Sequence, residues 1–220
     1  MTDANHSALM DDVYRHQRYI YDLTRKYYLF GRDTLIRDLA LRDGERVIEI
    51  GCGTARNLIA IARRYPGARL YGLDASHEML KSAAAAIARH GLSGRIKLVH
   101  AYAEDLTPQL FGEEAPFDRA IFSYSLSMIP DWRKALRAAA AAVRPGGQIH
   151  AVDFGDLTGL GRMIAGILKW WLHRFHVEPR VEILQTLERH RSAGGALRVL
   201  LARYAFILRG SPDSILHLAD

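Results

Sequence analysis

The sequence has few of the features that secreted or membrane-spanning proteins need. Its 220 residues include one cysteine, Cys52, so no disulfide can form within the chain, which favours a reducing compartment. No run of about 20 apolar residues is available to span a bilayer. Residues 1–12 also lack the apolar stretch of a secretory signal. Together these absences predict a cytoplasmic protein.

Nothing in the sequence divides the chain into separate domains. No long tract rich in proline, serine or glycine marks a linker, and no internal repeat is found. With 49% hydrophobic residues, a chain of this length suits one domain with a sizeable core, so residues 1–220 are expected to form a single domain. The net charge of +6 fits either a solvated basic surface or an anionic partner, nucleic acid or an acidic membrane face.

Segments typical of strands alternate with segments that favour helix. The expected strands are Arg46–Ile50, Arg69–Leu73, Arg95–His100, Asp118–Phe122 and Gln148–Asp153. The expected helices are Thr54–Arg64, one that runs from a Ser76 cap to His90, Trp132–Val143 and, later, Pro179–Arg191. This alternation predicts right-handed crossovers and a doubly wound, mostly parallel α/β sheet. A closing hairpin of Ala196–Ala202 and Arg203–Leu208 would add one antiparallel strand.

A glycine-rich turn follows the first expected strand, in Glu49-Ile50-Gly51-Cys52-Gly53-Thr54. Glycines there allow the backbone to pass close to a ligand. A dinucleotide site would need a third glycine where this chain has Arg56, and Glu49 would repel a pyrophosphate. The turn therefore favours a ligand with positive charge and no phosphate, such as S-adenosylmethionine. Cys52 is expected to be a small turn residue, since no histidine is placed to activate it.

Acidic residues also follow the next two expected strands. Asp74 ends the second strand, where a carboxylate can accept hydrogen bonds from ribose hydroxyls. Glu104 and Asp105 follow the third strand and can either hold an adenine amino group or cap a helix. One such acid is commonly an exposed loop carboxylate, but their repetition at successive strand ends favours a nucleoside site.

From about residue 40 to its end, the chain resembles the class I methyltransferases, in its first motif Glu49–Thr54, in Asp74 and in Glu104-Asp105. The resemblance implies a Rossmann-like sheet of seven strands with the last one antiparallel. It implies S-adenosylmethionine as the methyl donor, S-adenosylhomocysteine as the product, and no metal. It places Arg56 and Asn57 near the methionine portion, and Ala75 and Met79 beside the adenine. The full cofactor-binding set expected is Glu49, Gly51, Cys52, Gly53, Arg56, Asn57, Asp74, Ala75, Met79, Ala103, Glu104, Asp105 and Ser123.

The loop after the fourth expected strand, Ser123–Trp132, usually faces the acceptor in this fold. It lacks the Asn/Asp-Pro-Pro-Tyr signature of nucleic-acid amino methyltransferases, and no RNA-binding appendage is recognisable. We therefore expect no nucleic-acid partner, despite the basic charge.

Two flanking segments bear on the acceptor, and each allows two interpretations. In an N-terminal helical segment, residues 1–40, Tyr14, Tyr21 and Tyr28 are seven apart and would share one helix face. They form either a packing stripe or a lid, whose aromatic faces attract a quaternary ammonium while basic residues hold an anionic head group. The amphipathic segment 157–177, with Trp170 and Trp171, either lies in a membrane interface or packs on the sheet or in a dimer.

Two motifs resemble the bacterial betaine-lipid N-methyltransferase family, BtaB: His16–Asp33, and Ser125-Leu126-Ser127-Met128-Ile129-Pro130. The resemblance implies successive methylation of diacylglycerylhomoserine to diacylglyceryl-trimethylhomoserine. The residues expected to contact the acceptor are Tyr21 and Tyr19 as the catalytic pair, and Arg18, Lys26, Arg32 and Tyr124 as binding groups.

The expected setting of this reaction is the anionic inner face of the membrane, with peripheral association; homo-oligomerisation stays open. The alternatives are methylation of phosphatidylethanolamine, of a quinone precursor or of nucleic acid, or a binding protein that transfers no methyl group.

Overall fold

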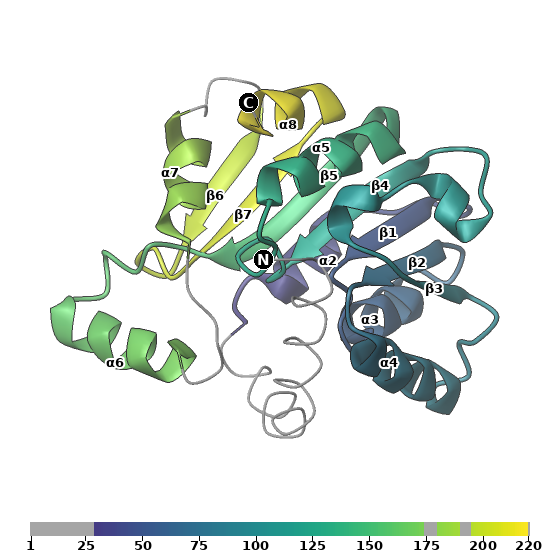
Figure 1. Ribbon diagram of the computed structural model, residues 1–220, viewed down its shortest axis with the longest axis horizontal. Helices are drawn as coiled ribbons and strands as arrows, with labels where there is room; N and C mark the ends of the chain where they lie inside the picture. Colours follow the sequence, from purple (N-terminus) through teal and green to yellow (C-terminus); the bar gives the residue numbers. More distant parts are fainter. Residues whose placement is uncertain (1–28, 174–179, 190–194, 220) are drawn as a thin grey trace.

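A computed structural model describes residues 29–173, 180–189 and 195–219. Within them, one sheet has the strand order β3-β2-β1-β4-β5-β7-β6 (Figure 1). β1 to β5 pair in parallel, and β7 runs antiparallel to both β5 and β6. The strands are Arg46–Ile50 (β1), Arg69–Asp74 (β2), Ile96–His100 (β3), Phe117–Ser123 (β4), Val143–Phe154 (β5), Ala196–Leu200 (β6) and Ala205–Gly210 (β7). The predicted fold, seven strands with one antiparallel, is confirmed.

Helices cover both faces of this sheet (Figure 1). One face carries α2 (Arg32–Asp38), α3 (Arg56–Arg64) and α4 (His77–Arg89), and the other carries α5 (Trp132–Ala142) and α8 (Pro212–Ala219). Because successive side chains of a strand point to opposite faces, β1 contributes to two cores. Val47 packs with the α2–α4 helices, whereas Ile48 and Ile50 pack with α5 and α8.

Several predicted boundaries were wrong, and local backbone geometry explains them. The helix expected from Thr54 begins at Arg56, because Ala55 takes a left-handed φ of 60° at the cap. The first strand of the closing hairpin ends at Leu200 instead of Ala202, and the second runs from Ala205 to Gly210 instead of from Arg203 to Leu208. Leu201, Ala202 and Arg203 all have positive φ and lie in the turn between them. Arg203 is held there by Asp156, at 2.7 Å, and by Glu188, at 2.8 Å.

Some elements differ in extent from the prediction or were missed by it. β5 begins at Val143, earlier than expected, and α7 spans Val181–Arg189. Helix α8 and the short 3-10 helices Ala103–Asp105 (η1) and Pro108–Phe111 (η2) were not predicted from the sequence. Of the expected N-terminal helical segment, residues 1–28 lie outside the described residues.

The amphipathic segment forms helix α6, Arg162–His173, which begins at Arg162 rather than at the predicted residue 157; the predicted end lies among residues 174–179, outside the described ones. Ala165 and Leu168 pack against the core beneath α2–α4. The opposite side of α6 exposes three large apolar side chains, named here the α6 apolar face: Met163 (77% exposed), Ile167 (62%) and Trp170 (63%). In the parts of the chain described, no helix is long and apolar enough to cross a membrane.

Candidate functional site

The glycine-rich turn leaves the carboxyl end of β1, at the centre of the sheet. The backbone N–H groups of Gly51 and Cys52 both donate to the Leu73 carbonyl oxygen, at 2.8 and 3.0 Å. Gly51 has a φ of 72°, and a Cβ on it would lie 2.6 Å from the Ser125 Cβ. Glycine is therefore required at this position for both its backbone conformation and its close contact with the loop after β4.

Asp74, at the end of β2, holds this turn through its carboxylate. Its Oδ2 accepts from the Gly53 N–H at 2.7 Å, and its Oδ1 accepts from the Ser76 N–H at 2.9 Å. Ser76 in turn caps α4 by accepting from the Met79 N–H, as predicted. Each carboxylate oxygen can accept more than one hydrogen bond, so the predicted ribose contact of Asp74 is compatible with this second, structural function.

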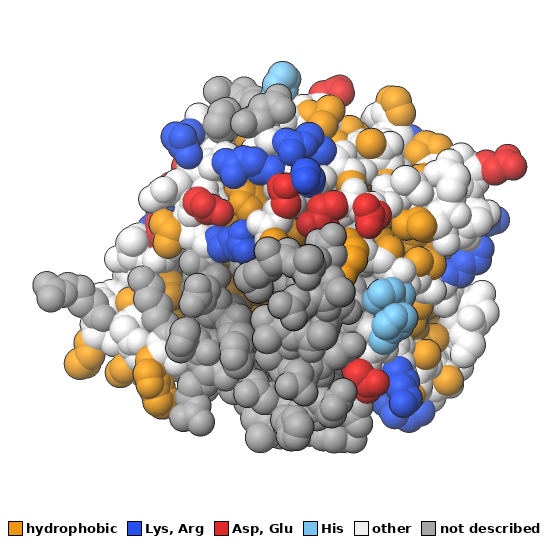
Figure 2. All heavy atoms as spheres, viewed as in Figure 1, with side chains coloured by type: hydrophobic (Ala, Val, Ile, Leu, Met, Phe, Trp, Pro, Cys, Tyr) orange, Lys and Arg blue, Asp and Glu red, His pale blue; other side chains and the backbone are white. Residues whose placement is uncertain are grey.

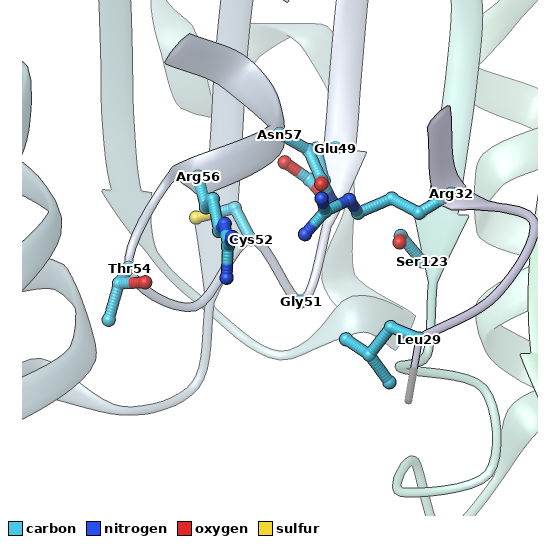
Figure 3. Close-up of a pocket in the computed structure, with 9 residues that line it drawn as sticks. All are labelled: Leu29, Arg32, Glu49, Gly51, Cys52, Thr54, Arg56, Asn57 and Ser123. Atoms are coloured by element: carbon cyan, nitrogen blue, oxygen red, sulfur yellow. The ribbon is translucent and has the colours of Figure 1, made fainter. Parts of the chain in front are cut away.

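A pocket opens between the glycine turn, the start of α3 and the segment before α2 (Figure 3). It is lined by Leu29, Arg32, Glu49, Gly51, Cys52, Thr54, Arg56, Asn57 and Ser123. Glu49 is 1% exposed, and its Oε1 accepts from the Asn57 Nδ2 at 2.6 Å. The pocket thus brings together six residues of the predicted cofactor-binding set and adds Leu29, Thr54 and Arg32. Arg32 had been assigned to the acceptor.

The charges of this pocket suit an amino acid moiety, which carries one ammonium and one carboxylate. Glu49 supplies a negative charge beside the glycine turn, and the guanidinium groups of Arg32 and Arg56 supply positive charge (Figure 3). Ser123 Oγ is buried and, within the described residues, has no hydrogen-bond partner, so a polar ligand atom can satisfy it. The residues present therefore fit the methionine portion of S-adenosylmethionine.

The sulfur of Cys52 lies in the same turn but is not poised as a nucleophile. The thiol is buried, and burial, followed by the charges of Asp74 and Glu49, holds its pKa well above the ordinary value. A neutral, buried thiol is a weak nucleophile, which agrees with the prediction that Cys52 is a small turn residue.

The loop after β4 is fixed against both the turn and β5. Ser125 Oγ donates to the Ile50 carbonyl oxygen at 2.8 Å, and Asp153 Oδ2 accepts from the Ser127 N–H at 3.0 Å. Asp153 is fully buried, and this burial raises its pKa to about 6 against the opposing effect of its N–H donors. Arg180, directly before α7, donates to the carbonyl oxygens of Ser127 and Pro130, both at 3.0 Å.

Asp153 and Arg180 were missed by the sequence analysis. Asp153 follows the same pattern as Glu49 and Asp74, an acid near the carboxyl end of a strand, and that pattern was a usable signal. Arg180 is 53 residues from Ser127, and no local motif marks their contact.

Tyr124, assigned to the acceptor from the sequence, lies mainly inside the protein. It is 2% exposed, its hydroxyl donates to the Phe30 carbonyl oxygen at 2.6 Å, and its ring packs edge-on against Phe154. In this arrangement Tyr124 joins the loop after β4 to the segment before α2. Its contact with an acceptor stays a prediction.

The predicted adenine-side residues lie beyond the residues that line the pocket. Met79 is buried in the core, and Ala103 is buried on the other face of the sheet. Glu104 is half-buried and Asp105 exposed within η1. The Ala75 carbonyl oxygen lies 3.0 Å from His100 Nε2. The contacts of these residues with adenine remain predictions.

The four remaining acceptor residues, Tyr19, Tyr21, Arg18 and Lys26, lie outside the described residues. Among the residues that are described, no cluster of three or more histidine, cysteine or acidic side chains is suited to hold a metal ion.

Comparison with known proteins agrees with this geometry. Residues 47–147 match a methyltransferase domain family. The ubiquinone/menaquinone biosynthesis C-methyltransferase UbiE of Syntrophotalea carbinolica is 30% identical over 166 residues, which are 73% of this chain and 66% of that protein. The demethylmenaquinone methyltransferase of Geobacillus kaustophilus is 30% identical over 135 residues, 61% of this chain and 56% of that protein. The chain thus spans less than two thirds of these relatives' length.

A solved structure extends the likeness over nearly the whole chain. The S-adenosylmethionine-dependent methyltransferase of Aquifex aeolicus superimposes with a TM-score of 0.61 and 14% identity, covering 95% of this chain and 97% of that one. At this identity the likeness concerns the fold.

Proposed function

Because residues 47–147 match a methyltransferase domain family and the sheet has seven strands with one antiparallel, we propose that the chain is a class I S-adenosylmethionine-dependent methyltransferase that methylates the head-group amine of a membrane lipid, diacylglycerylhomoserine. The single observation that carries methyl transfer is the buried Glu49 beside the glycine turn, with Asn57, Ser123 and two arginines around the same pocket. The specific acceptor rests on different observations, which follow.

S-adenosylmethionine, when bound, supplies an electrophilic methyl group on a sulfonium. In our proposal Glu49 accepts a hydrogen bond from its ammonium, while Arg32 and Arg56 face its carboxylate. Methyl transfer depends mainly on proximity and alignment. The fixed loop Ser125–Pro130, held by Asp153 and Arg180, would provide a rigid wall against which the acceptor amine is aligned.

The α6 apolar face supports a lipid acceptor. Met163, Ile167 and Trp170 are spaced by four and three residues, so they share one side of the helix. α6 lies at one end of the molecule, and hydrophobic side chains are visible at the surface there (Figures 1 and 2). A helix that packs one side on the protein and exposes apolar groups on the other suits a membrane interface, where lipid substrates reside.

The choice of diacylglycerylhomoserine depends on the two segments that resemble the betaine-lipid family, His16–Asp33 and Ser125–Pro130. The acceptor amine would form the new N–C bond as the donor S–C bond breaks, leaving S-adenosylhomocysteine, and its proton would pass to water. The head group also bears a carboxylate, for which arginine offers two parallel hydrogen bonds.

A second candidate is C-methylation of a quinone precursor. It is favoured by the relatives themselves, since both proteins described above are named as methyltransferases of quinone biosynthesis. Quinone precursors carry long apolar tails, so the α6 apolar face does not separate the two candidates.

Lipid extracts separate them. The chain would be expressed in cells that make diacylglycerylhomoserine and a demethylated quinone precursor but methylate neither, and lipids and quinones would be examined by mass spectrometry. We expect mono-, di- and trimethylated homoserine lipid, with the quinone pool unchanged. New methylation confined to quinones or phosphatidylethanolamine would refute the proposed acceptor, and unaltered extracts would refute both candidates.

A further inference from the structure

A second cavity, a groove of about 720 Å³, lies between α3 and α4. Its positive charges come from Arg32, Arg56 and Arg63 on one side and from Lys81 and Arg89 on α4. No acidic residue is among the described residues that line it. Arg32 already pairs with Asp33 at 3.1 Å, but the positive charges together outnumber the negative ones beside the groove and predict an anionic occupant, so the net charge of +6 is partly localised here.

The spacing along the two helices makes this groove elongated. Arg56 and Arg63 are seven residues apart on α3, about 10 Å, and Lys81 and Arg89 are eight apart on α4, about 12 Å. Between these charged positions the groove is lined by Ile59 and by small residues, mostly alanines. The cavity therefore combines two charged rows with an apolar floor.

Arg63, Lys81 and Arg89 are exposed, and none of the three has an ion-pair partner in the described parts of the chain. Their positive charge is available to a ligand. The groove also shares Arg32, Thr54 and Arg56 with the cofactor pocket, so the two cavities meet at the start of α3.

We propose that the α3–α4 groove is a binding site for an anionic phospholipid such as phosphatidylglycerol. The basic rows would bind the phosphodiester, and the apolar floor would contact the glycerol and the first acyl carbons. α6 packs on the same side of the sheet as α3 and α4, so the groove adds electrostatic attraction to the α6 apolar face. The inference rests on the proposed function only in assuming that the enzyme works at a membrane.

Vesicle sedimentation tests the proposal on the full chain. Wild-type protein should bind vesicles of phosphatidylcholine with phosphatidylglycerol and bind pure phosphatidylcholine vesicles weakly. Each basic residue near an anionic surface contributes about fivefold to the binding constant, so R63Q/K81Q/R89Q should bind about 100-fold more weakly. The matched variant R42Q/R69Q/R209Q removes the same charge from exposed positions outside the groove, which also have no ion-pair partner among the described residues, and should lose far less. Equal losses in the two variants would overturn the groove as a specific site.

Two further arms identify the ligand. Short-chain phosphatidylglycerol, titrated as monomers, should bind more tightly than inorganic phosphate, and equal binding would assign the groove to free phosphate instead. A single-stranded oligonucleotide that binds wild type but not R63Q/K81Q/R89Q, without any lipid binding, would replace the lipid by nucleic acid.

Activity in neutral detergent micelles keeps this inference separate from the proposed function. R63Q/K81Q/R89Q should methylate the micellar acceptor at the wild-type rate, because the three residues lie outside the cofactor pocket. If wild type methylates no lipid amine yet binds phosphatidylglycerol through the groove, the proposed function fails and this inference stands. A micellar rate that falls with the vesicle affinity would show that the three residues serve the reaction centre, and would refute a separate lipid site.

Discussion

Replacing Glu49 by glutamine removes one negative charge from the cofactor pocket while preserving the size of the side chain. The amide oxygen of glutamine can still accept from the Asn57 Nδ2, so the existing 2.6 Å contact need not be lost. The other position then carries an NH2 group, which cannot accept, so the charge-assisted hydrogen bond to a ligand ammonium is lost. Such a charge-assisted bond is worth roughly 1.5–3 kcal/mol, which corresponds to an affinity for S-adenosylhomocysteine about 10- to 150-fold weaker.

Titration calorimetry with two ligands makes the assignment specific. S-adenosylhomocysteine contains the amino acid moiety, whereas 5′-methylthioadenosine keeps the nucleoside and sulfur without it. Glu49→Gln should weaken the first ligand and leave the second nearly unchanged. Glu114→Gln, at an exposed position, is the matched control and should affect neither. Equal weakening of both ligands, or of neither, would refute the placement of the ammonium beside Glu49.

Three other perturbations follow from the structure. Asp74→Ala removes the acceptor of two backbone N–H groups, at 2.7 and 2.9 Å, so it should weaken the binding of both ligands and lower the free energy of unfolding by about 3 kcal/mol. An unchanged urea denaturation curve would contradict the stabilisation of the glycine turn by Asp74. Met163→Ser, Ile167→Ser and Trp170→Ser together should reduce flotation with liposomes while cofactor affinity is kept, with the exposed Leu201→Ser as control; undiminished flotation would argue against the α6 apolar face. Burial, with the charges of Arg119 and Arg209, lowers the pKa of His150 to about 3 in the folded protein. Between this value and the ordinary 6.5 of the unfolded chain, only the unfolded chain binds the proton, so the free energy of unfolding decreases as the pH falls. Between pH 7 and pH 5 wild type should therefore lose about 2 kcal/mol more than His150→Leu in urea unfolding, and parallel losses would disprove the buried neutral histidine.

The sheet could be predicted because its signals are local. The strands, the Ser76 cap and the glycine turn are each recognisable from a few neighbouring residues. The alternation of strands with helices then predicts the parallel topology. The ends of the closing hairpin were wrong because three consecutive left-handed residues, 201–203, are stabilised by Arg203's distant partners Asp156 and Glu188.

The site could be predicted only where its chemistry follows from residue type. Glu49 near the end of β1, Asn57 near the start of α3 and Ser123 at the end of β4 line one pocket, and their contact with the cofactor stays a prediction. Two contacts depend on tertiary geometry. Asp74 accepts from the Gly53 N–H, and Arg180 donates to the Ser127 carbonyl oxygen in the loop after β4. No periodicity or residue spacing in the sequence predicts such contacts.

One measurement tests the identity of the methyl acceptor most directly. Purified protein would be incubated with methyl-labelled S-adenosylmethionine and, separately, with diacylglycerylhomoserine, phosphatidylethanolamine and a demethylated quinone precursor in identical micelles. Mass spectrometry should find label in diacylglycerylhomoserine alone, progressing from the monomethyl to the trimethyl form. Label found only in phosphatidylethanolamine or only in the quinone precursor would contradict the account.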